Sequence, residues 1–271
     1  MRTGKYIPLP ADRRLVCDVI EIARKMPTAP LSCEYDVTEI KRLRRLAPVK
    51  LSWQVIMMRA YALASRDIPE LRQVYAPLPW PRIYQHSESV CMLTVAREHE
   101  GREALFFARF CQPENRSLVQ LQESFDHYRR APLSEIRQLK HQMRFARMPW
   151  LIRKLGWTVL THLMPASRAR QMGTFGLSLS SYRNVKGVCH LGHCKTTLGY
   201  DQLCRKGKAY ATLTFDHRIL DGKPAVDVLE HLGNVLKNQV TAEMRMLVKQ
   251  NPDKGKEREQ VRLFDQSKMS A

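Results

Sequence analysis

The sequence lacks several features that would assign it to a broad class at once. None of its apolar runs approaches the roughly 18 residues that a membrane-spanning helix requires. The opening residues, MRTGKYIPLPADRR, lack the apolar core of a secretory signal. No zinc-finger or RNA-recognition motif, internal repeat or low-complexity linker is present. We therefore expect a soluble globular protein without a nucleic-acid partner.

Acidic residues are scarce relative to basic ones, with 26 Asp and Glu against 45 Lys and Arg and a net charge of +19. Such a surface suits nucleic acid, anionic lipid or a phosphorylated small molecule. The basic residues are spread along the chain, so a merely solubilising surface explains them equally well. The seven cysteines form an odd, scattered set, which indicates free thiols in a reducing compartment and a cytoplasmic location.

Apolar residues recur with helical spacing in some segments and alternate with polar residues in others. Residues 12–26 carry an apolar helical stripe, whereas 31–37 alternate as in a half-buried strand. Ser117 and Gln120 have the spacing of a capping box at the start of a helix. The same patterns predict further helices at 38–45, 52–63, 118–125 and 225–240, and strands at 89–96, 103–111, 174–180 and 208–216.

These interleaved helices and strands predict one α/β or α+β domain over residues 1–249. The Pro-rich stretch 76–84 predicts a turn or an extended connection. Residues 250–271 are charged and nearly free of large apolar groups, so we expect a frayed, disordered tail there.

The stretch LTFDHRILDG (213–222) places His217 where a predicted strand ends. Side chains at such an end project from a rigid edge into open space, which suits catalytic groups. Imidazole titrates close to physiological pH, so it can take a proton from a thiol. Gly222 permits a sharp turn after Asp221, which lets Asp221 brace the loop. A structural histidine and aspartate would give the same string, so the motif alone leaves both interpretations open.

The string FDHRILDG resembles the active-site signature of the dihydrolipoamide acyltransferase cores of 2-oxo acid dehydrogenase complexes. A shorter His-x-x-x-Asp-Gly version occurs in the related chloramphenicol acetyltransferases. Further similar stretches are MGTFGLSLSS, IMMRAYALASRDIPELR, RRLVCDVIEIARKM and PENRSLVQLQE. Together they cover about residues 10–240. The resemblance implies a chloramphenicol acetyltransferase-like two-layer sandwich, in which helices pack on a mixed sheet.

The resemblance also implies roles for individual residues. His217 is the general base that takes a proton from a thiol or hydroxyl acceptor, and the resulting nucleophile attacks an acyl thioester. Ser178 donates a hydrogen bond to the tetrahedral oxyanion, and Asp221 orients the histidine. Because Ser180 and Ser181 lie close by, a shifted match would move the serine role. In the family the histidine and serine meet across a subunit boundary, which implies a homotrimer or a higher assembly of trimers.

Neighbouring charged residues fit supporting roles. Asp216 and Arg218 are interpreted as a local ion pair and not as catalysts. An arginine from the first predicted helix is the expected partner of Asp221, with Arg14 as the candidate. Coenzyme A is the implied substrate, and its phosphates suit a strongly basic chain. The residues that bind it stay unassigned.

The chain departs from the family pattern, and this leaves the acceptor open. We expect a stand-alone form without a lipoyl domain or a domain that binds partner enzymes. The acyl group then passes to a lipoylated carrier made elsewhere or to an alcohol or amine. The interval from Ser178 to His217 is 217 − 178 = 39 residues, shorter than the family pattern, so a loop near the cofactor channel is trimmed. The alternative function is a catalytically silent scaffold or assembly protein, and a protein that binds nucleic acid or membrane by charge alone ranks last.

Residues 134–171 have no good counterpart in the resemblance and form a basic, apolar helical insertion. Three interpretations stay open. The helices can pack against the core or form a trimer contact, lie on a membrane surface through 143–170, or cover a long acyl chain.

The string CHLGHCK gathers Cys189, His190, His193 and Cys194, which are ligand types that zinc prefers. Four ligands within six residues do not easily reach one tetrahedral centre, and alternation along a strand would send them to opposite faces. We therefore expect no metal site.

Overall fold

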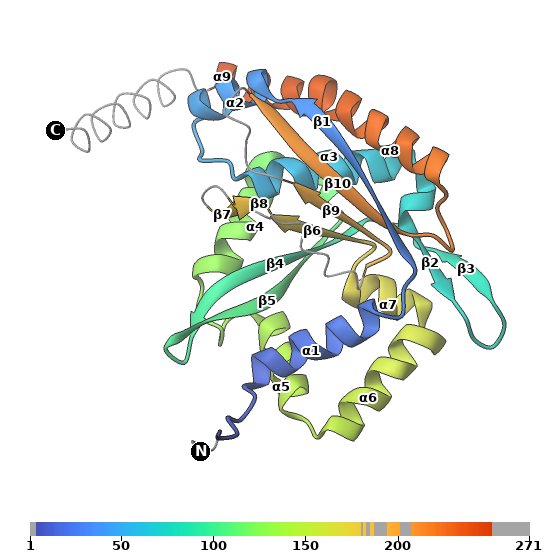
Figure 1. Cartoon of the computed structure of the whole chain (residues 1–271). Helices are drawn as coiled ribbons and strands as arrows, with labels where there is room; N and C mark the ends of the chain where they lie inside the picture. Colours follow the sequence, from blue (N-terminus) through green and yellow to red (C-terminus); the bar gives the residue numbers. More distant parts are fainter. Residues whose placement is uncertain (1–3, 180, 183–184, 187–193, 201–206, 251–271) are drawn as a thin grey trace.

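Six strands form a mixed sheet at the centre of the molecule, in the order β1-β10-β9-β6-β4-β5 (Figure 1). The computed structural model describes residues 4–179, 181–182, 185–186, 194–200 and 207–250. The strands of the sheet are β1 (Thr28–Asp36), β4 (Val90–His99), β5 (Arg102–Cys111), β6 (Phe175–Leu179), β9 (Thr196–Tyr200) and β10 (Lys208–Asp216). Strand β6 runs parallel to β4 and β9, whereas the other neighbouring pairs are antiparallel. The predicted mixed α/β class is confirmed.

Helices that bury large apolar side chains cover one face of this sheet (upper part of Figure 1). The innermost helix has apolar residues around most of its circumference, as a helix buried on all sides requires. Leu177, Leu198 and Leu213 supply the sheet side of the same core. The helices of this layer are α2 (Thr38–Leu46), α3 (Trp53–Asp67), α4 (Leu118–Arg130), α8 (Gly222–Val235) and α9 (Thr241–Gln250), with α3 innermost and the π-helical turn η4 (Leu236–Val240) joining the last two.

A second group of helices packs on the opposite face, over β4 and β5 (lower part of Figure 1). These helices are α1 (Ala11–Ala23), α5 (Arg137–Arg147), α6 (Trp150–Thr158) and α7 (Pro165–Met172), with the π-helical turn η3 (Val159–Leu163) between the last two. Towards β1 and β10 the same face carries the exposed side chains of Ser32, Glu34 and Tyr210. The predicted two-layer sandwich is therefore extended by a third layer on one half, most of which comes from the 134–171 insertion.

The insertion also pairs with β5, which lies at the edge of the sheet. An edge strand exposes backbone groups that have no neighbouring strand. Gln142 Oε1 accepts the Phe107 N–H at 3.2 Å, while Gln142 Nε2 donates to Phe107 O at 2.6 Å. Gln138 Oε1 accepts the Arg109 N–H at 3.2 Å. Side-chain amides of α5 thus take the place of a further strand.

Most sequence-predicted elements lie where the patterns put them. The capping box before α4 is confirmed, because Gln120 N–H donates to Ser117 Oγ at 3.3 Å and Ser117 N–H donates to Gln120 Oε1 at 3.0 Å. Residues 77–81 of the Pro-rich stretch form the predicted connection, but it joins two short hairpin strands that the sequence did not reveal. The smaller elements are η1 (Pro69–Arg72), β2 (Gln73–Ala76), β3 (Arg82–Gln85), η2 (Pro113–Asn115), β7 (Ser181–Tyr182) and β8 (Val185–Lys186). The predicted tail at 250–271 falls, beyond its first residue, outside the described residues.

A largely buried ion pair fastens α6 to α1. Arg153 Nε donates to Asp18 Oδ2 at 2.8 Å, and Arg153 Nη2 donates to Asp18 Oδ1 at 3.2 Å. Trp157 Nε1 donates to Asp18 Oδ2 at 3.1 Å. The side chains of Arg153 and Asp18 are 7% and 12% exposed, and their hydrogen bond raises the pKa of Arg153. One carboxylate therefore holds two residues of the insertion.

We expect Asp18→Asn to lower the free energy of unfolding by about 3 kcal/mol, because the Arg153 cation would lose its charged partner in a low-dielectric site. Urea unfolding followed by tryptophan fluorescence measures the change. Glu21→Gln, at an exposed position on the same helix, serves as the control and should stay within about 0.5 kcal/mol of the parent. Equal effects of the two substitutions would contradict the assignment of this ion pair as the fastening of α6.

Candidate active site

His217 lies just beyond the end of β10, in a loop that backbone hydrogen bonds hold in place. Its N–H donates to Pro27 O at 2.9 Å, and the preceding Asp216 N–H donates to Lys195 O at 2.8 Å. The His217 side chain is 51% exposed. An anchored backbone with an open imidazole matches the prediction that this side chain projects from a rigid edge.

The Asp216 and Arg218 side chains form the predicted local ion pair. Arg218 Nε and Nη2 donate to the two carboxylate oxygens of Asp216 at 2.9 and 2.6 Å. The Arg218 guanidinium also lies over the Tyr75 ring, 4.4 Å from its centroid. The hydrogen bond to Asp216 raises the pKa of Arg218. Because the Asp216 carboxylate is buried, this pair fixes the base of the His217 loop.

Asp221 occupies the N-cap position of α8, and its Oδ1 lies 3.3 Å from Nδ1 of His217. Its side chain is 82% exposed, so in a single chain water weakens this pairing. Arg14, the expected partner of Asp221, instead donates from Nε to Leu9 O at 3.0 Å. Within one chain, the expected arginine contact is thus replaced by direct contact of Asp221 with His217.

Two buried cations beneath the His217 loop escaped the sequence analysis. The Lys195 ammonium donates to Glu70 O, and burial lowers the pKa of Lys195 to about 7 against the attraction of Asp216 and Glu70. Arg168 Nη1 donates to Tyr75 O at 3.2 Å, and burial lowers the pKa of Arg168. Both side chains act on the buried Asp216 carboxylate. No local sequence pattern marks them, since their burial depends on the assembled fold.

Ser178 lies near the end of β6, on the sheet face opposite to the α3 layer. The alternating residues Phe175 and Leu177 belong to the main core, which places Ser178 on the other face. Its partner across the ladder is Gly199 of β9, which in turn faces Thr212 of β10. Ser178 is half-buried. The position suits a hydroxyl that projects from the sheet beside a glycine.

One chain does not bring Ser178 and His217 together. Strands β6 and β10 run in opposite directions, so their carboxyl ends lie at opposite ends of the sheet. His217 is five residues beyond Thr212, which lies two strands away from Ser178. Strand spacing and rise then separate the two backbones by about 20 Å. A site that uses both residues requires a second copy of the chain.

The CHLGHCK string falls largely outside the described residues, where Cys189, His190 and His193 lie. Cys194 is buried, and its thiol donates to Met172 O at 3.1 Å. Burial raises the pKa of Cys194 to about 12, which disfavours the thiolate that a metal requires. Among the described residues, no three His, Cys, Asp or Glu side chains gather as a metal site would require.

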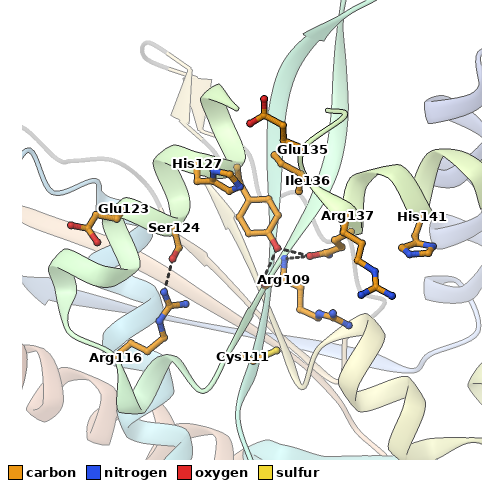
Figure 2. Close-up of a pocket in the computed structure, with 12 residues that line it drawn as sticks. Arg109, Cys111, Arg116, Glu123, Ser124, His127, Glu135, Ile136, Arg137 and His141 are labelled. Carbon is orange, nitrogen blue, oxygen red and sulfur yellow. Dashed lines mark hydrogen bonds between the residues drawn. The ribbon is translucent and has the colours of Figure 1, made fainter. Parts of the chain in front are cut away.

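The insertion encloses an apolar cavity of about 1240 Å³ against β4, β5 and α1. A neighbouring polar pocket of about 820 Å³ shares Arg109, Gln138 and His141 with it. Figure 2 shows Arg109 and His141 on one side of that pocket and Arg116 with Ser124 on the other. Both cavities adjoin the β5 edge of the sheet, whereas His217 follows β10 near the opposite edge.

The outer face of α6 carries exposed apolar residues. Trp150 and Leu151 are 55% and 70% exposed and do not line the apolar cavity, and the Lys154 ammonium lies 4.8 Å from the centroid of the Trp150 ring. No helix in the described part of the chain is long and apolar enough to cross a membrane.

Solved structures of acyltransferase cores share this fold. A truncated catalytic core of the 2-oxoacid dehydrogenase multienzyme complex from Thermoplasma acidophilum matches with a TM-score of 0.62 and 17% identity, over 87% of this chain and 99% of that one. The cubic core of the pyruvate dehydrogenase multienzyme complex matches with a TM-score of 0.60 and 16% identity, over 87% and 92%.

A third structure is that of the Azotobacter vinelandii dihydrolipoamide acetyltransferase, with a TM-score of 0.60 and 16% identity over 87% and 92% of the chains. In that enzyme, a serine, a histidine and an asparagine were investigated for their role in the catalytic mechanism. No protein-family model and no curated protein matches the sequence. The chain has the fold of dihydrolipoamide acyltransferase catalytic cores, and the resemblance that the sequence motifs indicated is confirmed at the level of the fold.

The low pKa of Lys195 predicts a pH-dependent stability. Between about pH 7 and the ordinary lysine pKa, the unfolded chain binds a proton that the folded chain does not. The free energy of unfolding should therefore rise with pH across this window, by at most about 1.4 kcal/mol per unit relative to Lys195→Met. Urea unfolding at a series of pH values measures the slope. The exposed Lys50→Met control should run parallel to the parent, and a parallel course for Lys195→Met as well would refute the lowered pKa of Lys195.

Proposed function

We propose that this protein is a coenzyme A-dependent acyltransferase whose active site lies between two subunits of a homotrimer. The observation that carries the proposal is the pairing of Asp221 with Nδ1 of an exposed, backbone-anchored His217, on the fold of acyltransferase cores. The cytoplasm remains the proposed location. Five described cysteines have free thiols, which supports a reducing compartment.

The Asp221 contact favours a proton on Nδ1 of His217 and leaves the lone pair of Nε2 as the base. The acceptor thiol or hydroxyl gives its proton to Nε2, while its sulfur or oxygen forms a bond to the thioester carbonyl carbon. The carbonyl electron pair moves to oxygen, and Ser178 donates a hydrogen bond to that oxyanion. When the carbonyl re-forms, the bond to coenzyme A sulfur breaks and His217 returns the proton to this sulfur.

The geometry of the sheet supports a site that is shared between subunits. Because about 20 Å separates Ser178 from His217 in one chain, the histidine must act on a substrate held beside the serine of a neighbouring subunit. The similar solved structures include the cubic core of a multienzyme complex, which supports a higher assembly of trimers. An inactive scaffold would not need the Asp221 contact with the imidazole.

The implied substrate is anionic, and the surroundings of the His217 loop suit it. A cavity of about 360 Å³ beside Arg218 is lined by Lys25, Lys154 and Arg168. Two acidic residues, Asp18 and Glu21, also line it, and the charge of Asp18 is paired with Arg153. The acceptor is either a lipoylated carrier made elsewhere or a small alcohol or amine. Comparing thiol release from acyl-coenzyme A with and without dihydrolipoamide distinguishes these acceptors.

His217→Ala should lower the turnover of acyl-coenzyme A by about 10²–10⁴-fold, because the proton acceptor is removed. Release of the coenzyme A thiol, followed with a thiol reagent, measures the rate. His231→Ala is a matched control, since His231 also forms a surface pair with an aspartate, Asp67, at 3.1 Å. Near-normal turnover in His217→Ala would show that another group is the base. Absence of turnover in the parent with every donor would favour the scaffold function.

Mixed trimers test the shared site. Ser178→Ala and His217→Ala chains, each with its own tag, are produced together, and assemblies with both tags are isolated. If each site takes its histidine from one chain and its serine from the next, a trimer of both variants holds one intact site, and about one third of parent activity returns. If both groups act from the same chain, no intact site forms and the mixed trimers stay as inactive as each variant alone.

A further inference from the structure

The apolar cavity beneath the insertion has the size and the lining of a ligand-binding site. The cavity measures about 1240 Å³ and is partly open to solvent, where Ile152 and Leu155 of its wall are 53% and 65% exposed. That volume exceeds the roughly 300–1,000 Å³ of typical pockets for small organic ligands, which are also mostly apolar, so it leaves room for a long chain. Its apolar lining comes from α1, the sheet and the insertion, and includes Leu15, Met92, Phe107, Phe145, Leu160 and Met172.

The polar groups around the cavity indicate the charge of its ligand. The amides of Gln138 and Gln142 are engaged with the β5 backbone. Every other ionisable group among the described lining residues is basic, namely Arg109, His141, Arg144 and Arg170. Arg109 Nη1 donates to Arg170 O at 3.1 Å, which holds its guanidinium at the cavity. An apolar chain on an anionic carrier matches these walls better than a neutral or cationic amphiphile.

The cavity opens on the sheet face that carries Ser178. Met92, a lining residue, is the ladder partner of Gly176, two residues before Ser178. Residues two apart on a strand share a face, so Met92, Gly176 and Ser178 all face the insertion. One strand spacing and two residues of rise put the Met92 and Ser178 backbones about 8 Å apart. A short acyl group attached beside Ser178 would end before the cavity, whereas a long chain would enter it.

We infer that the cavity enclosed by α1, α5, α6 and the β4–β5 side of the sheet binds the long acyl chain of the thioester donor. This inference rests on the proposed function, because Ser178 defines the place of the thioester. It assigns the insertion a role in substrate selection: the inner side of α6 lines the chain, while its outer side faces away from the sheet (Figure 1).

The test measures binding and needs no turnover. Straight-chain fatty acids from butyrate to palmitate are titrated into the parent protein by isothermal calorimetry. The expected result is an affinity that rises by up to about fourfold per added methylene over the lengths that fill the cavity. For a given chain length, the carboxylate should bind more tightly than the alcohol, and the alcohol more tightly than the trimethylammonium compound.

Two substitutions of Leu160 should impair binding in the cavity in different ways. Leu160→Trp fills it with apolar volume, and Leu160→Asp places a carboxylate in its wall. Each should weaken palmitate binding at least about tenfold. Leu151→Asp is the matched control, because Leu151 lies on α6, which leads directly into the η3 turn of Leu160, is 70% exposed and does not line the cavity. A cooperative thermal unfolding transition confirms that a variant is folded. If Leu160→Asp does not fold, Leu160→Trp carries the test alone.

The outcomes separate this inference from its alternatives. Absence of fatty-acid binding by the parent, or equal binding by the parent and Leu160→Trp, would overturn it while leaving the His217 chemistry intact. Binding lost in Leu151→Asp but kept in Leu160→Trp would also overturn it, and would assign the outer face of α6 to lipid surfaces. Fatty acids that bind as expected to a protein without acyl-coenzyme A turnover would instead refute the proposed function and leave a fatty-acid site.

Discussion

The direction of β10 relative to β6 decides whether Ser178 and His217 can meet within one chain. Strand β6 pairs in parallel with β9, and β9 pairs in antiparallel fashion with β10. The strand ends that carry Ser178 and His217 therefore lie at opposite ends of the sheet. Side-chain motion does not close a gap of about 20 Å. Chemistry that uses both residues therefore requires a second copy of the chain, and in the proposed trimer the stability of the assembly would limit activity.

The loop that presents His217 is anchored at one end, at the buried Asp216, and exposed to solvent at the other, at Asp221. The Asp216 carboxylate is buried against Arg218, with Lys195 and Arg168 close enough to act on it. An unpaired buried carboxylate would be costly, and these cations offset that cost. Asp221, in contrast, contacts the imidazole in solvent. Covering by a neighbouring subunit would remove water from this contact and strengthen it.

Sequence patterns predicted what is encoded locally. The capping box of Ser117, the alternation along β10 and the site string around His217 each lie within a few residues of chain, and the structure has them in place. The Asp18–Arg153 pair joins residues 135 positions apart, and the burial of Lys195 depends on several elements, so neither leaves a local signal. The β2–β3 hairpin escaped because its proline-rich connection masked two short strands.

The insertion satisfies the unpaired backbone groups of the edge strand β5, and the way it attaches leaves the apolar cavity. Strand β5 is an edge, and Gln138 and Gln142 of α5 satisfy its backbone. To reach β5 in this way, α5 must stand beside the strand, and α6 is then held at a distance by its contact with Asp18 on α1. The space between these two attachments is the apolar cavity. A change at Asp18 would therefore alter both the stability of the fold and the shape of the cavity inferred to bind the acyl chain, which couples the two properties through one carboxylate.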